Sequence, residues 1–284
     1  MQRYKILHRT CYQFSGTVQL NSHTLLLRPR EGHELRIESS NLTVTPAMAT
    51  LHWYRDVEDN SVAIITFESS CKQLIIESEV IIQQFNETPL DFWVSNFAID
   101  YPFAYSPEDA VLLQPYLGLT EPNNTDALDG WIAGILQASE KIQTYTLVQR
   151  LCSHIHQTMS YQMREEPGVQ TVVQTLSLKS GSCRDFANLF MQACRRLGLA
   201  SRFVSGYLHV PVSAQGYGST HAWSEVYMPG AGWKGFDPTV GEIVGRQHIA
   251  VAVSHKPERV PPVSGSFVGP PGASLSVGVW VTEL

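Results

Sequence analysis

Residues 180–187 read Ser-Gly-Ser-Cys-Arg-Asp-Phe-Ala, and this stretch marks the start of a helix. Ser182 is followed three residues later by Asp185, which resembles a capping box with Asp in place of the usual Glu. The apolar residues that come next recur at helical spacing: Phe186, Leu189, Phe190, Ala193 and Leu197. Gly198 then provides a natural C-terminal stop. The pattern predicts a helix of about four turns with Cys183 in its first turn.

Cys183 is a candidate nucleophile because of this position. A thiol attacks a carbonyl carbon only as the thiolate, and a free cysteine is mostly protonated at neutral pH. The unpaired N–H groups and the dipole at a helix N-terminus favour a negative charge there. A neighbouring imidazolium also lowers a thiol pKa, and it has to come from another part of the fold.

A β-hairpin predicted further along the chain supplies the histidine. Residues 221–228 and 233–237 read as two strands, and a Pro-Gly-Ala-Gly turn at 229–232 joins them. His221 opens the first strand and Asp237 closes the second, so they face each other directly if the turn is centred near residue 229. Centring on the four turn residues instead shifts the pairing by about three positions. Because opposed residues have Cβ atoms about 5 Å apart, Asp237 is expected to hold one ring nitrogen of His221 and leave the other for the thiol.

The rest of the chain predicts two domains of the α+β class. Residues 1–105 read as short strands with turns between them, typical of an antiparallel β-sandwich-like domain. Residues 106–140 are interrupted by proline and glycine and read as a linker. Residues 141–284 form the predicted core, which begins with an amphipathic helix around 147–159 and ends with a C-terminal strand at 275–282.

Composition and charge exclude several classes of protein. Of 284 residues 43% are apolar and 16% charged, which is typical of a folded chain with a sizeable core. The net charge is −6 and no run of Lys or Arg stands out, so no nucleic-acid partner is predicted. Charged residues interrupt the N-terminus, and no stretch is long enough to cross a bilayer. We therefore expect a cytoplasmic protein with no membrane partner.

The cysteines do not form a recognisable pattern of pairs. Their number is odd and no two have CxxC spacing: Cys11, Cys71, Cys152, Cys183 and Cys194. This argues against a disulfide framework and against a structural zinc site. Most of them are expected to be small buried apolar residues, including Cys194, about three turns after Cys183 on the predicted helix. No cofactor is predicted.

Three segments resemble the core motifs of the transglutaminase-like superfamily in its bacterial members. They are Gly181-Ser182-Cys183-Arg184-Asp185-Phe186-Ala187, His221-Ala222-Trp223 and Phe236-Asp237-Pro238-Thr239. The segments Leu27–Arg30 and His248–Val253 resemble the same proteins, so the resemblance covers nearly the whole chain. It implies a papain-like transglutaminase core behind an N-terminal β-domain, with Cys183 as nucleophile, His221 as base and acid, and Asp237 as orienter. Bacterial members are often described as candidate cysteine proteases.

The reaction that this resemblance implies is attack of Cys183 on an amide carbonyl of a peptide or protein. Water then hydrolyses the resulting thioester, or an amine converts it to a new amide. The backbone N–H of Cys183 is a candidate oxyanion donor, and Trp223 and Gln174 are candidates for the second. The sequence departs from the family at Ser182, where a hydrophobic residue is common, and at Lys256-Pro257, in a segment that is often acidic. Both departures leave the substrate open.

Each residue also has an ordinary interpretation when it is taken alone. An isolated Cys183 is most often a buried helix cysteine, and an Asp before a proline usually forms a turn. A metal site made of Cys183, His221 and Asp237 is a minor alternative, because no fourth ligand lies nearby in sequence. Arg184 and Asp185 are expected to hold the helix start or to form a surface pair. The alternative to catalysis is a non-catalytic module that binds a peptide in the same cleft.

Overall fold

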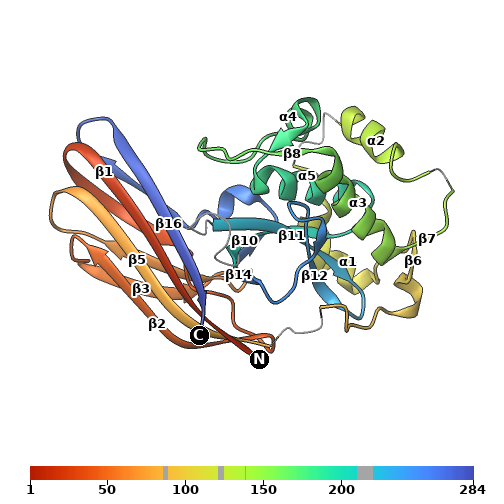
Figure 1. Cartoon of the computed structure of the whole chain (residues 1–284), viewed down its shortest axis with the longest axis horizontal. Coiled ribbons are helices and arrows are strands. Elements are labelled where there is room, and N and C mark those ends of the chain that lie inside the picture. Colours follow the sequence, from red (N-terminus) through yellow and green to blue (C-terminus); the bar gives the residue numbers. More distant parts are fainter. Residues whose placement is uncertain (86–88, 121–124, 138, 210–219) are drawn as a thin grey trace.

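The computed structural model describes residues 1–85, 89–120, 125–137, 139–209 and 220–284. Figure 1 shows a curled antiparallel sheet beside a core in which helices pack on a second sheet. The predicted α+β class is confirmed. Within the described ranges, no helix combines the length and the apolar character that crossing a bilayer requires.

Within the described residues, the N-terminal sheet has seven strands and is built around β1 (Gln2–Leu25). Five of them follow the order β2-β5-β1-β4-β3, and the other two pair with β1. Its other members are β2 (Leu35–Thr45), β3 (Thr50–Arg55), β4 (Ser61–Thr66), β5 (Cys71–Gln84), β15 (Val263–Val268) and β16 (Ala273–Glu283). Along β5 every second residue from Leu74 to Gln84 is buried, the period of two that a half-buried strand requires. The predicted antiparallel β-structure of this region is confirmed.

The last two strands of the chain, β15 and β16, belong to the N-terminal sheet. The prediction that the C-terminal strand is part of the core was therefore wrong. β16 pairs with β1 from Tyr4↔Glu283 to Phe14↔Ala273. The two chain ends therefore lie close together (Figure 1). Alternating burial identifies a strand but does not identify its neighbour, and here the neighbour is the first strand of the chain.

The expected linker at 106–140 contains two helices, α1 (Pro107–Leu117) and α2 (Asp126–Ala133). The hydroxyl of Ser106 accepts a hydrogen bond from the N–H of Asp109 and caps α1. Pro107 is the first residue of that helix, a position where a missing N–H costs nothing. The prolines that suggested a linker therefore include one that starts a helix.

The core sheet runs in the order β13-β12-β11-β10-β14. Its strands are β10 (Ser201–Leu208), β11 (Thr220–Met228), β12 (Gly232–Asp237), β13 (Glu242–Ile243) and β14 (His248–Ser254). The helices α3 (Thr144–Thr158), α4 (Val172–Leu178) and α5 (Cys183–Arg196) accompany it, and α5 contacts both β10 and β11. Two short pairs complete this part: β6 (Asp100–Tyr101) with β7 (Ile142–Gln143), and β8 (Ser160–Tyr161) with β9 (Ser180–Gly181). Two 3₁₀ turns lie at Asn96–Ala98 and Pro257–Arg259.

The predicted amphipathic helices are confirmed. α3 buries Leu147, Leu151 and Ile155 on one side, and α5 begins at Cys183 as the sequence predicted. Gly198, just after α5, has a φ of +77°, a left-handed conformation that favours glycine. Most of the loop predicted at 211–220 lies outside the described residues.

The N-terminal sheet and the core share one buried apolar cluster, in addition to a cluster within each part. Tyr4, Ile6 and Ile82 of the sheet pack with Tyr207 and Ile249 of the core. A buried hydrogen bond of 3.0 Å also joins His8 Nδ1 to the hydroxyl of Tyr207, and burial lowers the pKa of His8 to about 4, so the ring is neutral near pH 7. The two parts therefore form one structural unit.

Asn60 pairs with the outer edge of β14, the last strand of the core sheet. Its side-chain oxygen accepts from the N–H of Val253 at 2.8 Å, and its amide nitrogen donates to the Val253 carbonyl at 2.8 Å. The same oxygen accepts from Arg30 at 2.8 Å. Asn60 itself is buried.

We expect the Asn60→Ala variant to lose about 3 kcal/mol of unfolding free energy, because buried backbone groups without a partner cost about 1–3 kcal/mol each. Urea denaturation followed by tryptophan fluorescence measures the change. Asn41→Ala, on an exposed position of β2, is the matched control and should change stability by less than about 0.5 kcal/mol. Equal effects of the two substitutions would show that Asn60 does not hold the β14 edge.

Candidate active site

Cys183 occupies the first position of α5, and its side chain is 8% exposed. Amides in the first turn of a helix have no partner within the helix, so the N–H of Cys183 is available to a ligand. Cys183 belongs to a buried apolar cluster that also includes Ala222 of β11, Leu26 just after β1 and Val62 of β4. Residues from both parts of the molecule thus surround the nucleophile candidate.

Asp185 holds the start of α5 in place. Its fully buried carboxylate accepts from the N–H and the hydroxyl of Ser182, both at 2.8 Å, and from Arg164 at 2.7 Å. Burial alone would raise the pKa of Asp185. These hydrogen bonds and one from the N–H of Gln170 outweigh burial and lower the pKa below its ordinary value, so the carboxylate is ionised. Arg184 does not pair with Asp185, since it donates to the carbonyls of Arg164 and Glu166.

Gly181 leaves the space that this arrangement needs. A Cβ atom at this position would lie 2.8 Å from Cβ of Asp185, closer than side chains approach each other. The glycine two residues before Cys183 therefore permits the carboxylate to reach back to Ser182. This is a physical reason for a small residue in the first of the quoted motifs.

The hairpin forms as predicted, but its register differs from the direct opposition of His221 and Asp237. Ser224 pairs with Phe236 and Met228 with Gly232, so Asp237 lies two positions from the residue that would oppose His221. Diagonal neighbours on one face of an antiparallel pair remain within reach of long side chains. The hydrogen bond forms across this diagonal, with His221 Nε2 2.6 Å from Asp237 Oδ2.

The electrostatics of His221 favour its protonated form. Burial lowers the pKa of this ring, but the charge and hydrogen bond of Asp237, together with a hydrogen bond and the charge of Cys183, raise it to about 10. The pKa of Asp237 is held far below its usual range, because the two histidines around it outweigh its burial. Since Nε2 of His221 faces Asp237, Nδ1 is the nitrogen left for the thiol. The structure thus brings the three predicted residues together.

The other buried cysteines have a different environment. Cys152 in α3 and Cys194 in α5 are both fully buried, and this burial raises the pKa of each thiol well above its ordinary value. Cys194 packs in the apolar core, as the sequence predicted. Neither thiol is expected to ionise near neutral pH.

His248 is a member of the site that the sequence analysis did not single out. Its Nε2 lies 3.0 Å from Asp237 Oδ2, the same oxygen that contacts His221. The only signal in the sequence is that His248 opens the late segment that resembles bacterial relatives. Ligand-type atoms of His221, Asp237 and His248 lie within 4.8 Å of one another. Two ligand atoms of one tetrahedral ion, each about 2.1 Å from it, would lie roughly 3.4 Å apart. The contacts of 2.6 and 3.0 Å to Asp237 are shorter and fit hydrogen bonds, so we treat the group as a hydrogen-bonded chain.

Tyr161 was also missed, because a strand of two residues leaves no periodic pattern. β8 pairs in parallel with β9, so Tyr161 lies beside Gly181 and its ring contacts Phe186 edge-on at 6.5 Å. Burial, and then the charge of Cys183, raise the pKa of this phenol, so it keeps its hydrogen. The side chain is 51% exposed. It is thus a hydrogen-bond donor that is open to solvent and lies beside Gly181, two residues before Cys183.

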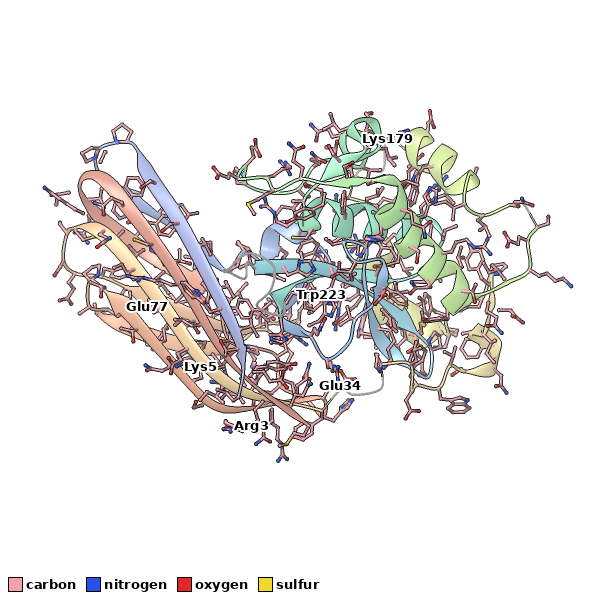
Figure 2. All side chains as sticks on the ribbon, viewed as in Figure 1. Arg3, Lys5, Glu34, Glu77, Lys179 and Trp223 are labelled. Carbon is pink, nitrogen blue, oxygen red and sulfur yellow. The ribbon has the colours of Figure 1, made fainter. Side chains whose placement is uncertain are left out.

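The two other oxyanion donors proposed from the sequence fit less well. The side-chain oxygen of Gln174 accepts from the N–H of Thr171 at 2.9 Å, as part of a capping box at the start of α4. Trp223 lies inside the core domain (Figure 2), with 1% of its surface exposed, and its ring contacts His248 edge-on at 5.2 Å. The Gln174 oxygen therefore caps α4, and the Trp223 ring packs against His248.

A hollow of about 470 Å³ lies on the loop that precedes α4. Its walls are polar and come from residues 162–166 and Gln170. The loop that forms them is tied to the helix start by the contacts of Arg164 and Gln170 with Asp185. A larger hollow of about 760 Å³ lies between α2 and the opposite end of α5, at Arg196, far along the helix from Cys183.

Comparison with known proteins agrees with these observations. Residues 135–238 match the model of the transglutaminase-like superfamily, and residues 4–83 match that of the bacterial transglutaminase-like N-terminal region. An uncharacterized protein of Mycobacterium tuberculosis is 28% identical over 275 residues, which cover 93% of this chain and 87% of that protein. An uncharacterized protein of Mycobacterium leprae is 35% identical over 108 residues, or 37% of this chain and 38% of that protein.

A solved structure shares the whole fold. The crystal structure of a putative cysteine protease from Cytophaga hutchinsonii superposes with a TM-score of 0.74, covering 100% of this chain and 91% of that chain. The sequence identity is 17%, so this likeness concerns the fold. It includes the N-terminal sheet as well as the core.

Proposed function

We propose that this chain, which carries a transglutaminase-like core and the N-terminal region of bacterial transglutaminase-like proteins, is a thiol-dependent hydrolase of peptide or amide bonds. The observation that carries the proposal is the position of His221. Asp237 holds one ring nitrogen at 2.6 Å, and the other is left for Cys183 at a helix N-terminus. This is the nucleophile, base and orienter geometry of cysteine peptidases.

In the first half of the reaction, the Cys183 sulfur attacks the carbonyl carbon and the carbonyl π electrons move to oxygen. His221 carries a proton, because Asp237 raises its pKa to about 10. When the tetrahedral intermediate collapses, the C–N bond breaks and His221 donates this proton to the departing amine. The acyl group remains on Cys183 as a thioester.

In the second half, neutral His221 removes a proton from a water molecule that attacks the thioester. The C–S bond breaks, the carboxylic acid leaves, and the thiolate and imidazolium are restored. A primary amine in place of water would give a new amide by the same steps. Hydrolysis is our first expectation, and transamidation is a variant of the same chemistry.

We assign two hydrogen-bond donors to the oxyanion that forms in this reaction. One is the N–H of Cys183, at the free end of α5. The other is the hydroxyl of Tyr161, whose raised pKa keeps it protonated. The polar hollow lined by residues 162–166 and Gln170 offers a place for a peptide chain on the loop that Asp185 ties to the start of α5. We therefore propose a peptide or protein as the substrate.

The second candidate function is a non-catalytic module that binds peptide in the same cleft. The match to the superfamily and the shared fold with a candidate cysteine protease are compatible with either function. The two differ in the chemistry of Cys183, because a binding module has no need of an imidazolium beside a thiol. The raised pKa of His221 favours the enzyme.

The reactivity of Cys183 tests this choice without a known substrate. We expect iodoacetamide at pH 7 to alkylate Cys183 at least about tenfold faster than a cysteine in an unstructured peptide, because a helix N-terminus and a neighbouring imidazolium both favour the reactive thiolate. Mass spectrometry of the digested native protein gives the rate at every cysteine. Cys152 and Cys194 are internal controls, which burial should leave unmodified. If Cys183 reacts like the free peptide, the enzyme interpretation fails.

The fate of the thioester requires a separate measurement. Incubation of a peptide library in ¹⁸O-water places one heavy oxygen on each new C-terminus that hydrolysis creates. Added methylamine instead gives a methylamide if an amine intercepts the thioester. The ratio of the two products in the native protein, with Cys183→Ala as blank, distinguishes hydrolysis from transamidation.

A further inference from the structure

Asp237 is held by three donors, and one of them is a second imidazole. Oδ2 contacts Nε2 of His221 at 2.6 Å and Nε2 of His248 at 3.0 Å. Oδ1 accepts from the N–H of Thr239 at 2.8 Å. A carboxylate with a single partner can rotate about its side-chain bonds, whereas donors on both oxygens fix both torsion angles. The side chain of Asp237 is fully buried, so these donors replace water.

The hydrogen bonds around His248 define its tautomer. The N–H of Gly245 donates to Nδ1 of His248 at 3.4 Å, so Nδ1 carries the lone pair. Nε2 then carries the hydrogen and donates it to Asp237. The ring is 8% exposed and lies edge-on against Trp223, with ring centres 5.2 Å apart. Packing and hydrogen bonding therefore hold His248 as a donor aimed at Asp237.

The N-terminal sheet holds the strand that carries His248. His248 is the first residue of β14, the edge strand of the core sheet. Gln84, at the end of β5, donates to the His248 carbonyl at 3.1 Å. Further along the same edge, the N–H of Arg30 donates to Ala250 at 2.9 Å, and Asn60 pairs with Val253. The outer edge of β14 is thus attached to the N-terminal sheet along its length.

We propose that His248 is a positioning residue of the active site, and that the N-terminal sheet contributes to catalysis by fixing it. His248 holds Asp237 Oδ2 in line with His221, so that the His221 ring keeps its other nitrogen toward Cys183. This inference rests on the proposed function, because it assigns a role in thiol activation. It also gives the N-terminal sheet a role in the chemistry.

Two substitutions at one position separate the hydrogen bond from the packing. In His248→Gln the amide nitrogen replaces Nε2 as donor to Asp237, and the amide oxygen accepts from Gly245. In His248→Phe a ring fills the space but donates nothing. We expect His248→Phe to slow alkylation of Cys183 by iodoacetamide by about 10- to 100-fold, the range known for removing the outer hydrogen-bond partner of a metal-bound histidine. His248→Gln is expected to recover most of the native rate.

The pH dependence adds a readout that packing alone does not change. Native protein and both variants are alkylated from pH 5 to 10, and the rate reports the thiolate fraction. His248→Phe is expected to move the rise of this profile to higher pH, while His248→Gln keeps the native profile. Once a substrate is known, the loss should fall on kcat, with KM little changed. Equal profiles for the native protein and His248→Phe would overturn the inference.

A measurement on the native protein covers the case in which a variant does not fold. In ¹⁵N-histidine NMR spectra, we expect His248 to show a hydrogen on Nε2, in a strong hydrogen bond, and a lone pair on Nδ1. A hydrogen on Nδ1 instead would overturn the proposal. If native Cys183 itself is no more reactive than a free thiol, the proposed function fails, and the NMR result still decides whether His248 donates to Asp237.

Discussion

In the Cys183→Ala variant we expect kcat/KM for a peptide substrate to fall by about a million-fold, the loss typical of removing the nucleophile of a triad. Without the sulfur no thioester forms, and only the oxyanion donors and the bound geometry remain to assist direct attack by water. Turnover of a fluorogenic peptide from the library screen measures the loss. The substitution removes one buried sulfur at a helix start, so the fold should remain intact.

Cys194→Ala is the matched control for this prediction. Cys194 lies on the same helix and is fully buried, and its thiol is not part of the site. We expect this variant to turn over the substrate at close to the native rate. Thermal unfolding of both variants establishes that any difference is chemical. Retention of more than about a tenth of the native activity in Cys183→Ala would contradict a covalent mechanism, which loses far more when its nucleophile is removed.

The second large effect is expected for Asp237→Asn, with a loss of about ten-thousand-fold in kcat, as for the corresponding change in Ser-His-Asp enzymes. The neutral amide no longer raises the pKa of His221, which then falls from about 10 toward its ordinary value of 6.5. In the native protein, ring nitrogens of His221 and His248 both contact Oδ2 of Asp237. In the variant, the NH₂ group of the asparagine is a donor that can face these two donors instead of the carboxylate oxygen. The alkaline limb of the kcat/KM profile should move to lower pH accordingly. A native profile in Asp237→Asn would show that Asp237 is not the orienter.

The same pair predicts how stability depends on pH. Because the folded pKa of His221 is above its unfolded value, the folded chain alone keeps this proton between pH 6.5 and about 10. The contribution of His221 is therefore complete below pH 6.5 and is lost as the pH rises through 10. The pKa of Asp237 is lowered in the folded chain, so this carboxylate stabilises the fold at pH values above its pKa in the unfolded chain. The stabilisation is lost in acid, as the pH falls through the folded pKa. Urea titrations from pH 6 to 10 should show falling stability in the native protein and a much flatter profile in Asp237→Asn.

Two local features of the site were predictable from the sequence. The capping residues and the apolar stripe after Cys183 define a helix start, and α5 begins at that residue. The Pro-Gly-Ala-Gly turn between two short apolar runs defines a hairpin, which forms as β11 and β12. Both depend on contacts between residues close in sequence, where hydrogen bonding and burial leave a periodic pattern.

The register of the hairpin was less well predicted. Direct opposition of His221 and Asp237 was the first expectation, and the structure shifts their pairing by two residues. The side chains meet because they share one face of the sheet, which a shift of two positions preserves. A shift of one position would have placed them on opposite faces. The candidate site thus survives this error because side chains alternate along a strand.

By itself, the sequence determined where the nucleophile, the imidazole and the carboxylate lie along the chain, and which kind of element carries each. The tertiary structure decided which distant segments complete the site. It placed His248 on Asp237, attached the edge of β14 to the N-terminal sheet, and moved β16 from the core to β1. Periodicity records which face of an element is buried, but it does not record which element covers that face. That choice depends on packing of the whole chain, and here it joins both parts of the molecule at the thiol.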